Sequence, residues 1–165
     1  MALYRQSRNI EASIIDYLTT NLASAFSGTT VEKTFKRVYG IPVDTFNKTG
    51  VVCVRLSETV HELVQIGDNS TQRLPLILID IFAPNDGIRL DLKDYLVSIL
   101  RSGIPYYEYE VSGNSITNKT QNGRIRVITI RDTEVNLGIN KSLLDVHDRH
   151  RHLLSLNVSL GKIEV

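Results

Sequence analysis

A long apolar run near the middle of the chain, Leu74–Ala83, has the sequence LPLILIDIFA. Successive side chains of a β-strand point to opposite faces, so Ile77, Ile79 and Ile81 would share one face of such a strand. The other face would carry Leu76, Leu78, Asp80 and Phe82. Apolar side chains on both faces stabilise a strand only when both faces are buried. The pattern therefore predicts a strand between two layers of its own fold, or between its sheet and a neighbouring subunit.

Asp80 bears on the choice between these two arrangements. A lone carboxylate is costly to bury, so we expect that the face carrying Asp80 is not a dry core of the monomer. The apolar side chains of that face are then candidates for contact with a neighbouring subunit: Leu76, Leu78 and Phe82.

Two segments have the apolar spacing of amphipathic helices. Large apolar residues recur at every third or fourth position over residues 10–26, with Ser7 or Asn9 as the expected cap. A second helix is expected to begin at Asp91, to run for about nine to twelve residues and to end before Gly103. Each helix has one apolar stripe, which predicts packing against a sheet.

The remaining segments predict strands, turns and one long hairpin. Residues 29–40 indicate an edge strand, 41–50 a loop with Pro and Gly as breakers, and 51–57 a strong strand. The C-terminal residues 153–160 alternate between apolar and polar side chains, which predicts a closing strand.

The hairpin is expected to pair Pro105–Val111 with Arg124–Arg131 across a polar loop. A register with Glu110 opposite Arg124 puts charge pairs on one face and tyrosines against aliphatic residues on the other. A change of phase after Val127 predicts a β-bulge.

Together these elements predict an α+β fold with a mostly antiparallel sheet packed by two main helices, a long hairpin and a C-terminal strand. We expect a single domain over residues 1–165, because domains of about 100–150 residues are the commonest. The composition, 42% hydrophobic and 22% charged, is typical of a globular chain. A formal charge of +1 excludes the global cationic bias of tight duplex binders.

Cellular location is suggested by what the sequence lacks. The N-terminus has no apolar signal region, and no apolar run approaches the roughly 20 residues of a membrane span. The single cysteine, Cys53, lies in a strand and is interpreted as a small buried hydrophobe. The chain is therefore expected to fold in a reducing cytoplasm, without a membrane partner.

The stretch DVHDRHRHLLSLNVSL, Asp145–Leu160, holds three of the four histidines. His150 and His152 would point the same way from a strand, which is half of a zinc site, and His147 is the candidate third ligand. The other interpretation, which we favour, is that they close one end of the core beside Asp145 or Asp148. The sequence contains no GxSxG, Walker or GxGxxG motif and nothing that demands an enzyme or a cofactor. A small metal-dependent hydrolase using these histidines is the catalytic alternative.

One long segment resembles a known family. The strand VQIG, the strand LIDIFA, the helix LKDYLVSIL, the strand IPYYEY and the closing HLLSLNVSLGKIE are similar to the central part of tail terminator and head-to-tail joining proteins of tailed bacteriophages. The resemblance covers roughly two-thirds of the chain, and its motifs are structural rather than catalytic.

This resemblance implies a structural protein that forms a hexameric ring at the end of the tail. The ring would contact the tail tube protein on one side and the neck connector on the other, and DNA would pass through it as cargo. The protein would then assemble in the host cytoplasm and reside in the virion. Another neck or tail component, namely a connector, stopper or sheath initiator, is the alternative.

Two polar connections, Ser112–Gly123 and Asp132–Asp148, are long for a small domain, and loops of this length are usually functional or disordered. We expect them to act as arms between subunits, at least one of them mobile in the free subunit and ordered in the assembly. Their candidate interface residues are Ser112, Asn118, Lys119 and Asn122 in the first, and Asn136 and Asn140 in the second.

Overall fold

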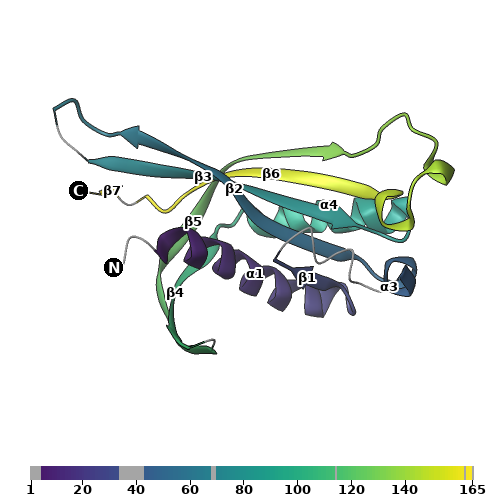
Figure 1. Ribbon diagram of the computed structural model, residues 1–165, viewed down its shortest axis with the longest axis horizontal. Helices are drawn as coiled ribbons and strands as arrows, with labels where there is room; N and C mark the ends of the chain where they lie inside the picture. Colours follow the sequence, from purple (N-terminus) through teal and green to yellow (C-terminus); the bar gives the residue numbers. More distant parts are fainter. Residues whose placement is uncertain (1–4, 34–42, 68–69, 114, 162, 165) are drawn as a thin grey trace.

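The computed structural model describes the chain except for residues 1–4, 34–42, 68–69, 114, 162 and 165. Two long helices, α1 (Gln6–Ala25) and α4 (Asp86–Leu100), pack on a sheet that curls into a half-barrel (Figure 1). The sheet contains β1 (Thr30–Glu32), β2 (Val51–Leu63), β3 (Thr71–Phe82), β4 (Ile104–Ser112), β5 (Ser115–Glu134), β6 (Arg151–Ser159) and β7 (Ile163–Glu164). Its order is β1-β2-β3-β6-β5-β4, and β7 pairs with β3 outside this path. The α+β class is therefore confirmed.

The expectation of a mostly antiparallel sheet is wrong, because the sheet is mixed. The edge strand β1 runs parallel to β2, with Thr30 opposite Val51. The connection over residues 33–50 is long enough for the crossover that parallel pairing needs. Part of this connection is the short helix α3 (Val43–Lys48), where a loop was expected. The predicted edge strand is confirmed for residues 30–32, and residues 34–40 of it lie outside the described residues.

One face of the sheet and the apolar stripes of both helices form the main core. Helical spacing predicted the buried stripe of α1, and the three isoleucines of β3 share one buried face of the strand as expected. The core side chains with no exposed surface include Ile14, Leu18, Leu22, Ile77, Ile79, Ile81, Leu92, Leu96, Leu100, Leu154, Leu156 and Val158. Each such side chain stabilises the fold by roughly 1.5–3 kcal/mol through removal of apolar surface from water.

Both helix starts differ from the sequence-based expectation. α4 begins at Asp86, because Asn85 caps it by accepting a hydrogen bond from the Ile88 backbone N–H at 2.9 Å. Asp91 therefore lies inside the helix. α1 has no side-chain cap, and both Ser7 and Asn9 lie within it. The predicted end of the second helix is confirmed, since Gly103 follows it with φ +79°.

The expected hairpin register is also wrong. Ser112–Gly123 is not a loop, because β5 begins at Ser115 and pairs with β4 as a long ribbon. Glu110 lies opposite Asn118, and Tyr109 lies opposite Lys119. Residues 115–124 are exposed on both faces, so cross-strand pairing rather than burial holds this polar strand, and no apolar alternation marks it. The bulge after Val127 is confirmed by a register shift before Thr129.

The second face of β3 is divided between two environments. At its C-terminal end, Phe82 is fully buried in a small second core with Val51 and Cys53, against which Val146 packs. Asp80 is 1% exposed and is paired with Arg151 through an Nη2 to Oδ1 contact of 3.1 Å.

The expectations for Asp80 and Phe82 are therefore wrong. Asp80 is buried inside its own fold together with a counter-ion, and Phe82 is a core residue rather than an interface residue. The Arg151 guanidinium lies 5.3 Å from the centroid of the Phe82 ring, so the same arginine covers both side chains. Leu76 and Leu78, on the same face, are only half-buried.

Replacing Arg151 by Met is expected to lower the free energy of unfolding by about 3 kcal/mol, because it leaves the Asp80 carboxylate buried without its partner. The double variant Asp80→Leu with Arg151→Met should recover about 2 kcal/mol of this loss. Urea denaturation of the wild type, the two single variants and the double variant measures both the loss and the recovery of unfolding free energy. Additive effects of the two substitutions would contradict a coupled buried pair.

Candidate functional site

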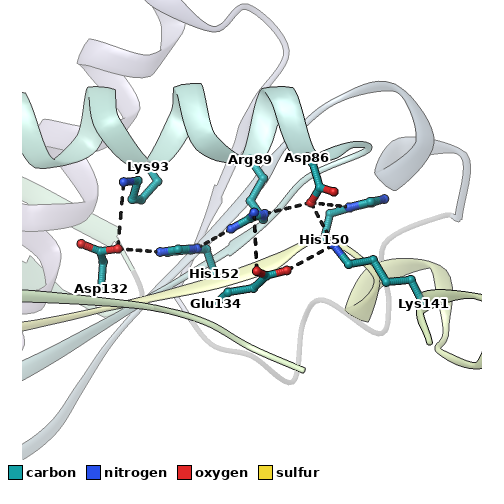
Figure 2. A network of polar contacts seen from close by, with 8 residues as sticks. All are labelled: Asp86, Arg89, Lys93, Asp132, Glu134, Lys141, His150 and His152. Carbon is teal, nitrogen blue, oxygen red and sulfur yellow. Dashed lines mark hydrogen bonds and ion pairs between the residues drawn. The ribbon is translucent and has the colours of Figure 1, made fainter. Parts of the chain in front are cut away.

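Eight polar side chains from four segments meet beside the N-terminal half of α4, and Figure 2 shows them. Three local periodicities bring them together. Positions spaced by three or four residues share one face of α4, and alternate residues share one face of β5 and of β6. The cluster consists of Asp86, Arg89 and Lys93 from α4, Asp132 and Glu134 from β5, Lys141 from the following 3₁₀ turn (Lys141–Leu143), His150 just before β6, and His152 near the start of β6.

Arg89 is the centre of this polar cluster and is 6% exposed. Its Nε lies 3.2 Å from an oxygen of Asp86, its Nη2 lies 3.7 Å from one of Glu134, and its Nη1 lies 2.7 Å from Nδ1 of His152. A guanidinium only donates hydrogen bonds, so Nδ1 of His152 must accept. The proton of His152 is then on Nε2, which donates to Asp132 at 3.0 Å. His152 is thus held as one neutral tautomer.

Asp86 links α4 to the polar connection that precedes β6. Its carboxylate accepts hydrogen bonds from Lys141 at 2.9 Å and from Nδ1 of His150 at 3.1 Å. The Lys141 hydrogen bond, followed by that of His150, holds the pKa of Asp86 well below its ordinary value of 3.8. The same contact with Asp86, together with Glu134, raises the pKa of Lys141. The contacts of Lys141 and His150 with Asp86 therefore hold the segment from Lys141 to β6 against the start of α4.

The three histidine candidates for a metal site have separate partners. His150 contacts Asp86, and His152 contacts Arg89 and Asp132. Nε2 of His147 lies 3.4 Å from a carboxylate oxygen of Asp148. The structure therefore does not bring His147, His150 and His152 around a common point.

Among the described residues, one group has ligand atoms close enough to surround a cation. It consists of Asp145, His147 and Asp148, whose atoms lie within 4.8 Å of one another. The expected pairing of His150 or His152 with Asp145 or Asp148 is wrong, although His152 does close one end of the core. Its true partner Asp132 is 20 residues away in sequence, which local spacing does not reveal.

A second feature is the outer part of the β2–β3 hairpin, residues 58–67 and 70–76, called the arm below. It extends from the body of the fold, at the left of Figure 1, beyond the helices. Leu63 is 70% exposed there, although leucine is normally buried. Apart from Leu90 of α4, the large exposed apolar side chains of the described residues lie on this arm and on two other segments: Val60, Leu63, Val64 and Ile66; Ile116 and Ile128 of β5; and Leu137, Ile139 and Leu143 after β5.

The polar interface candidates are exposed except Asn136, which is half-buried, and several make contacts within the subunit. Lys119 lies 3.0 Å from Asp16 and 4.7 Å from the centroid of the Tyr107 ring. Asn122 donates to Glu108 at 3.0 Å. Ser112 and Asn118 are exposed on the β4–β5 ribbon.

The two candidates in the second connection shape the chain locally. Asn136 has a φ of 63° and donates to the Asp148 carbonyl at 3.3 Å. Asn140 accepts from the Ser142 backbone N–H at 3.1 Å and so caps the 3₁₀ turn. Sequence reasoning chose polar loop residues and missed the exposed apolar ones, whose signal is an apolar residue beside turn residues, as at Ile66 and Leu137.

Comparison with known proteins assigns no family to the chain. No family model matches the sequence, and no curated protein matches it significantly. No helix in the described part of the chain is long and apolar enough to cross a membrane. Function must therefore be inferred from the residues and their contacts.

Replacing Asp86 by Asn should destabilise the protein at neutral pH and make less difference in acid. A carboxylate whose folded pKa is depressed contributes stability above its unfolded pKa and loses it as the pH falls through the folded value. The difference in Tm between the two proteins should thus be constant from pH 7 to about pH 5 and shrink below about pH 4. Thermal melts across this range measure it, and a difference that grows in acid would contradict the assigned contacts.

Proposed function

We propose that this chain is a non-catalytic structural subunit of a tailed-bacteriophage virion. In this proposal it is a tail terminator that assembles in the host cytoplasm into a hexameric ring. The ring caps the tail tube, contacts the tube protein on one side and the neck connector on the other, and lets DNA pass through as cargo.

The observation that carries this proposal is the position of the exposed apolar side chains. A monomer gains nothing by placing Leu63, Ile66, Leu137 and Leu143 in water, and large apolar side chains that gather on one surface, as on the arm, often mark a site of contact with another molecule. Leu63 and Ile66 lie on the arm, and Leu137 and Leu143 lie in the connection between β5 and β6, outside the buried core. Several separate contact segments on one small subunit suit a ring, in which each copy touches two neighbours.

The sequence resemblance supports the same role. Four of its segments fall on β3, α4, β4 and β6, which together supply one helix and three strands of the fold, whereas VQIG, expected as a strand, forms the turn after β2. A connector, stopper or sheath initiator would use the same kind of subunit and differs in its partners. Genes that flank this one and encode a tail tube protein and a head-completion protein would favour the terminator.

The purified protein is expected to form a closed ring of one size. Native mass spectrometry should give a single high oligomer, for which we propose six copies, and negative-stain electron microscopy should show a central channel. The expected driving force is burial of the exposed apolar side chains, so assembly should weaken on cooling.

A variant in which Leu63 and Ile66 are both replaced by Ser is the matched test of the arm. Its melting should stay close to that of the dissociated wild type, because both side chains are exposed in the subunit. Its ring population should fall sharply. A wild-type protein that stays monomeric at high micromolar concentration would contradict the proposed function.

A further inference from the structure

The face of the arm that continues the open side of the sheet is both acidic and apolar. In the β2–β3 register, Glu58 lies opposite Leu76, Val60 opposite Leu74, and Glu62 opposite Gln72, so these six side chains share one face. Glu58 and Glu62 are exposed, and neither has a partner among the described residues. Two carboxylates with no partner in the described part of the chain therefore flank an exposed valine, Val60, on the projecting strand pair.

A depression of the opposite character lies where α4 ends beside β5. It measures about 580 Å³ and is lined by Arg101, Arg124 and Arg126 together with Ile125, Val127 and Leu160. Arg124 is anchored, because its guanidinium donates to the carbonyls of Ser102 and Gly103 at 2.9 and 3.2 Å. Arg101 and Arg126 are exposed, and their guanidinium groups have no acceptor among the described residues.

We propose that this arginine depression is the docking site for the arm of a second copy of the chain, with Glu58 and Glu62 facing Arg101 and Arg126, and Val60 covering the apolar floor. The inference rests on the proposed function, which requires a contact between neighbours, and it names the two surfaces that meet. Carboxylate and guanidinium form the strongest ordinary charge-assisted hydrogen bonds, often with two parallel contacts. Within the described part of one subunit, no side chain pairs with Glu58 or Glu62 and none pairs with Arg101 or Arg126.

The contact is head-to-tail, because the arm and the depression are different surfaces of the same chain. A heterologous contact of this kind repeats from copy to copy and closes into a ring when the rotation permits. The arm is long enough to reach a neighbouring copy, since residues 58–63 alone extend about 20 Å at the usual rise of a strand.

A nucleic acid is the less favoured occupant of the depression. Proteins that hold duplex DNA by its backbone neutralise about six to ten phosphates, whereas three arginines line this site. A polar sugar–phosphate backbone would also gain little from contact with the apolar side chains of Val127 and Leu160. A strand with alternating carboxylates and an apolar side chain matches both the charge and the floor.

The first test is a charge exchange in the full-length protein. Glu58→Arg with Glu62→Arg, or Arg101→Glu with Arg126→Glu, should raise the concentration at which half of the subunits are in rings by at least about tenfold. The protein carrying all four changes should assemble near the wild-type concentration. Arg124 is left unchanged because it holds the end of α4. Arg8→Glu and Asp91→Arg, which reverse exposed charges elsewhere, are the matched controls and should assemble normally.

The second test is disulfide trapping with Glu62→Cys and Arg126→Cys. The native Cys53 will not interfere, since burial, with Asp80 adding to it, raises the pKa of its thiol to about 12. Under mild oxidation the double variant should give a ladder of covalent oligomers that ends at the ring size. A mixture of the two single variants should give dimers only. Replacing Arg126→Cys by Arg8→Cys in the double variant should give no ladder.

The outcomes separate this inference from the proposed function. Wild-type rings that are unaffected by the charge reversals and give no disulfide ladder would overturn the inference and leave the proposed function standing. A wild-type monomer at every concentration, by native mass spectrometry, would overturn both. Dimers from Glu62→Cys alone would show a self-paired arm and overturn the head-to-tail contact. Rings of Arg101→Glu with Arg126→Glu that form normally but lose binding to a duplex DNA probe would assign the depression to nucleic acid instead.

Discussion

The rest of this structure depends on the central position of β3, which must pair with β2 and β6 and bury side chains on both of its faces. One face carries Ile77, Ile79 and Ile81 and receives both helices, which fixes where α1 and α4 can lie. A one-residue slip of β3 would exchange this face with the one that carries Asp80 and would put a carboxylate against the helices. The register is therefore determined by the strand itself.

The second face of β3, which the helices do not cover, is buried at one end of the strand and half-exposed toward the other. Near Phe82, Val146 of the connection between β5 and β6 packs on it, and Arg151 pairs with Asp80 at the same place. Toward the arm, Leu76 and Leu78 lose that cover. The polar cluster around Arg89 secures the covered end to α4, because Lys141 and His150 both reach Asp86. One end of the sheet is thus covered within the subunit, while Leu76 and Leu78 toward the other end stay half-buried.

Local periodicity accounts for what the sequence could predict. The stripe from Ile10 to Leu22, the apolar face of β3 and the bulge after Val127 each repeat within a few residues, so residue spacing alone indicates them. The pairing of Asp80 with Arg151 joins residues 71 apart, and no spacing rule predicts such a contact.

The polar strand after Ser115 was missed for a different reason. It is held by backbone pairing with β4 and buries almost nothing, so its sequence looks like a loop. The sequence also misdirected the search for a functional site. The histidines drew attention because they are rare and clustered, whereas the exposed apolar residues of the arm were not recognised until their lack of cover was visible in three dimensions.

Hydrogen–deuterium exchange of the same protein, at a concentration below and a concentration above ring assembly, tests the central claim most directly. The account predicts that slowed exchange on assembly is concentrated in two places, the arm around residues 58–66 and the depression around residues 101–103 and 124–127. The backbone of α1 should exchange equally slowly in both states, because the subunit core buries it already. Slowed exchange that leaves both of these places unchanged, or no dependence on concentration at all, would contradict the account.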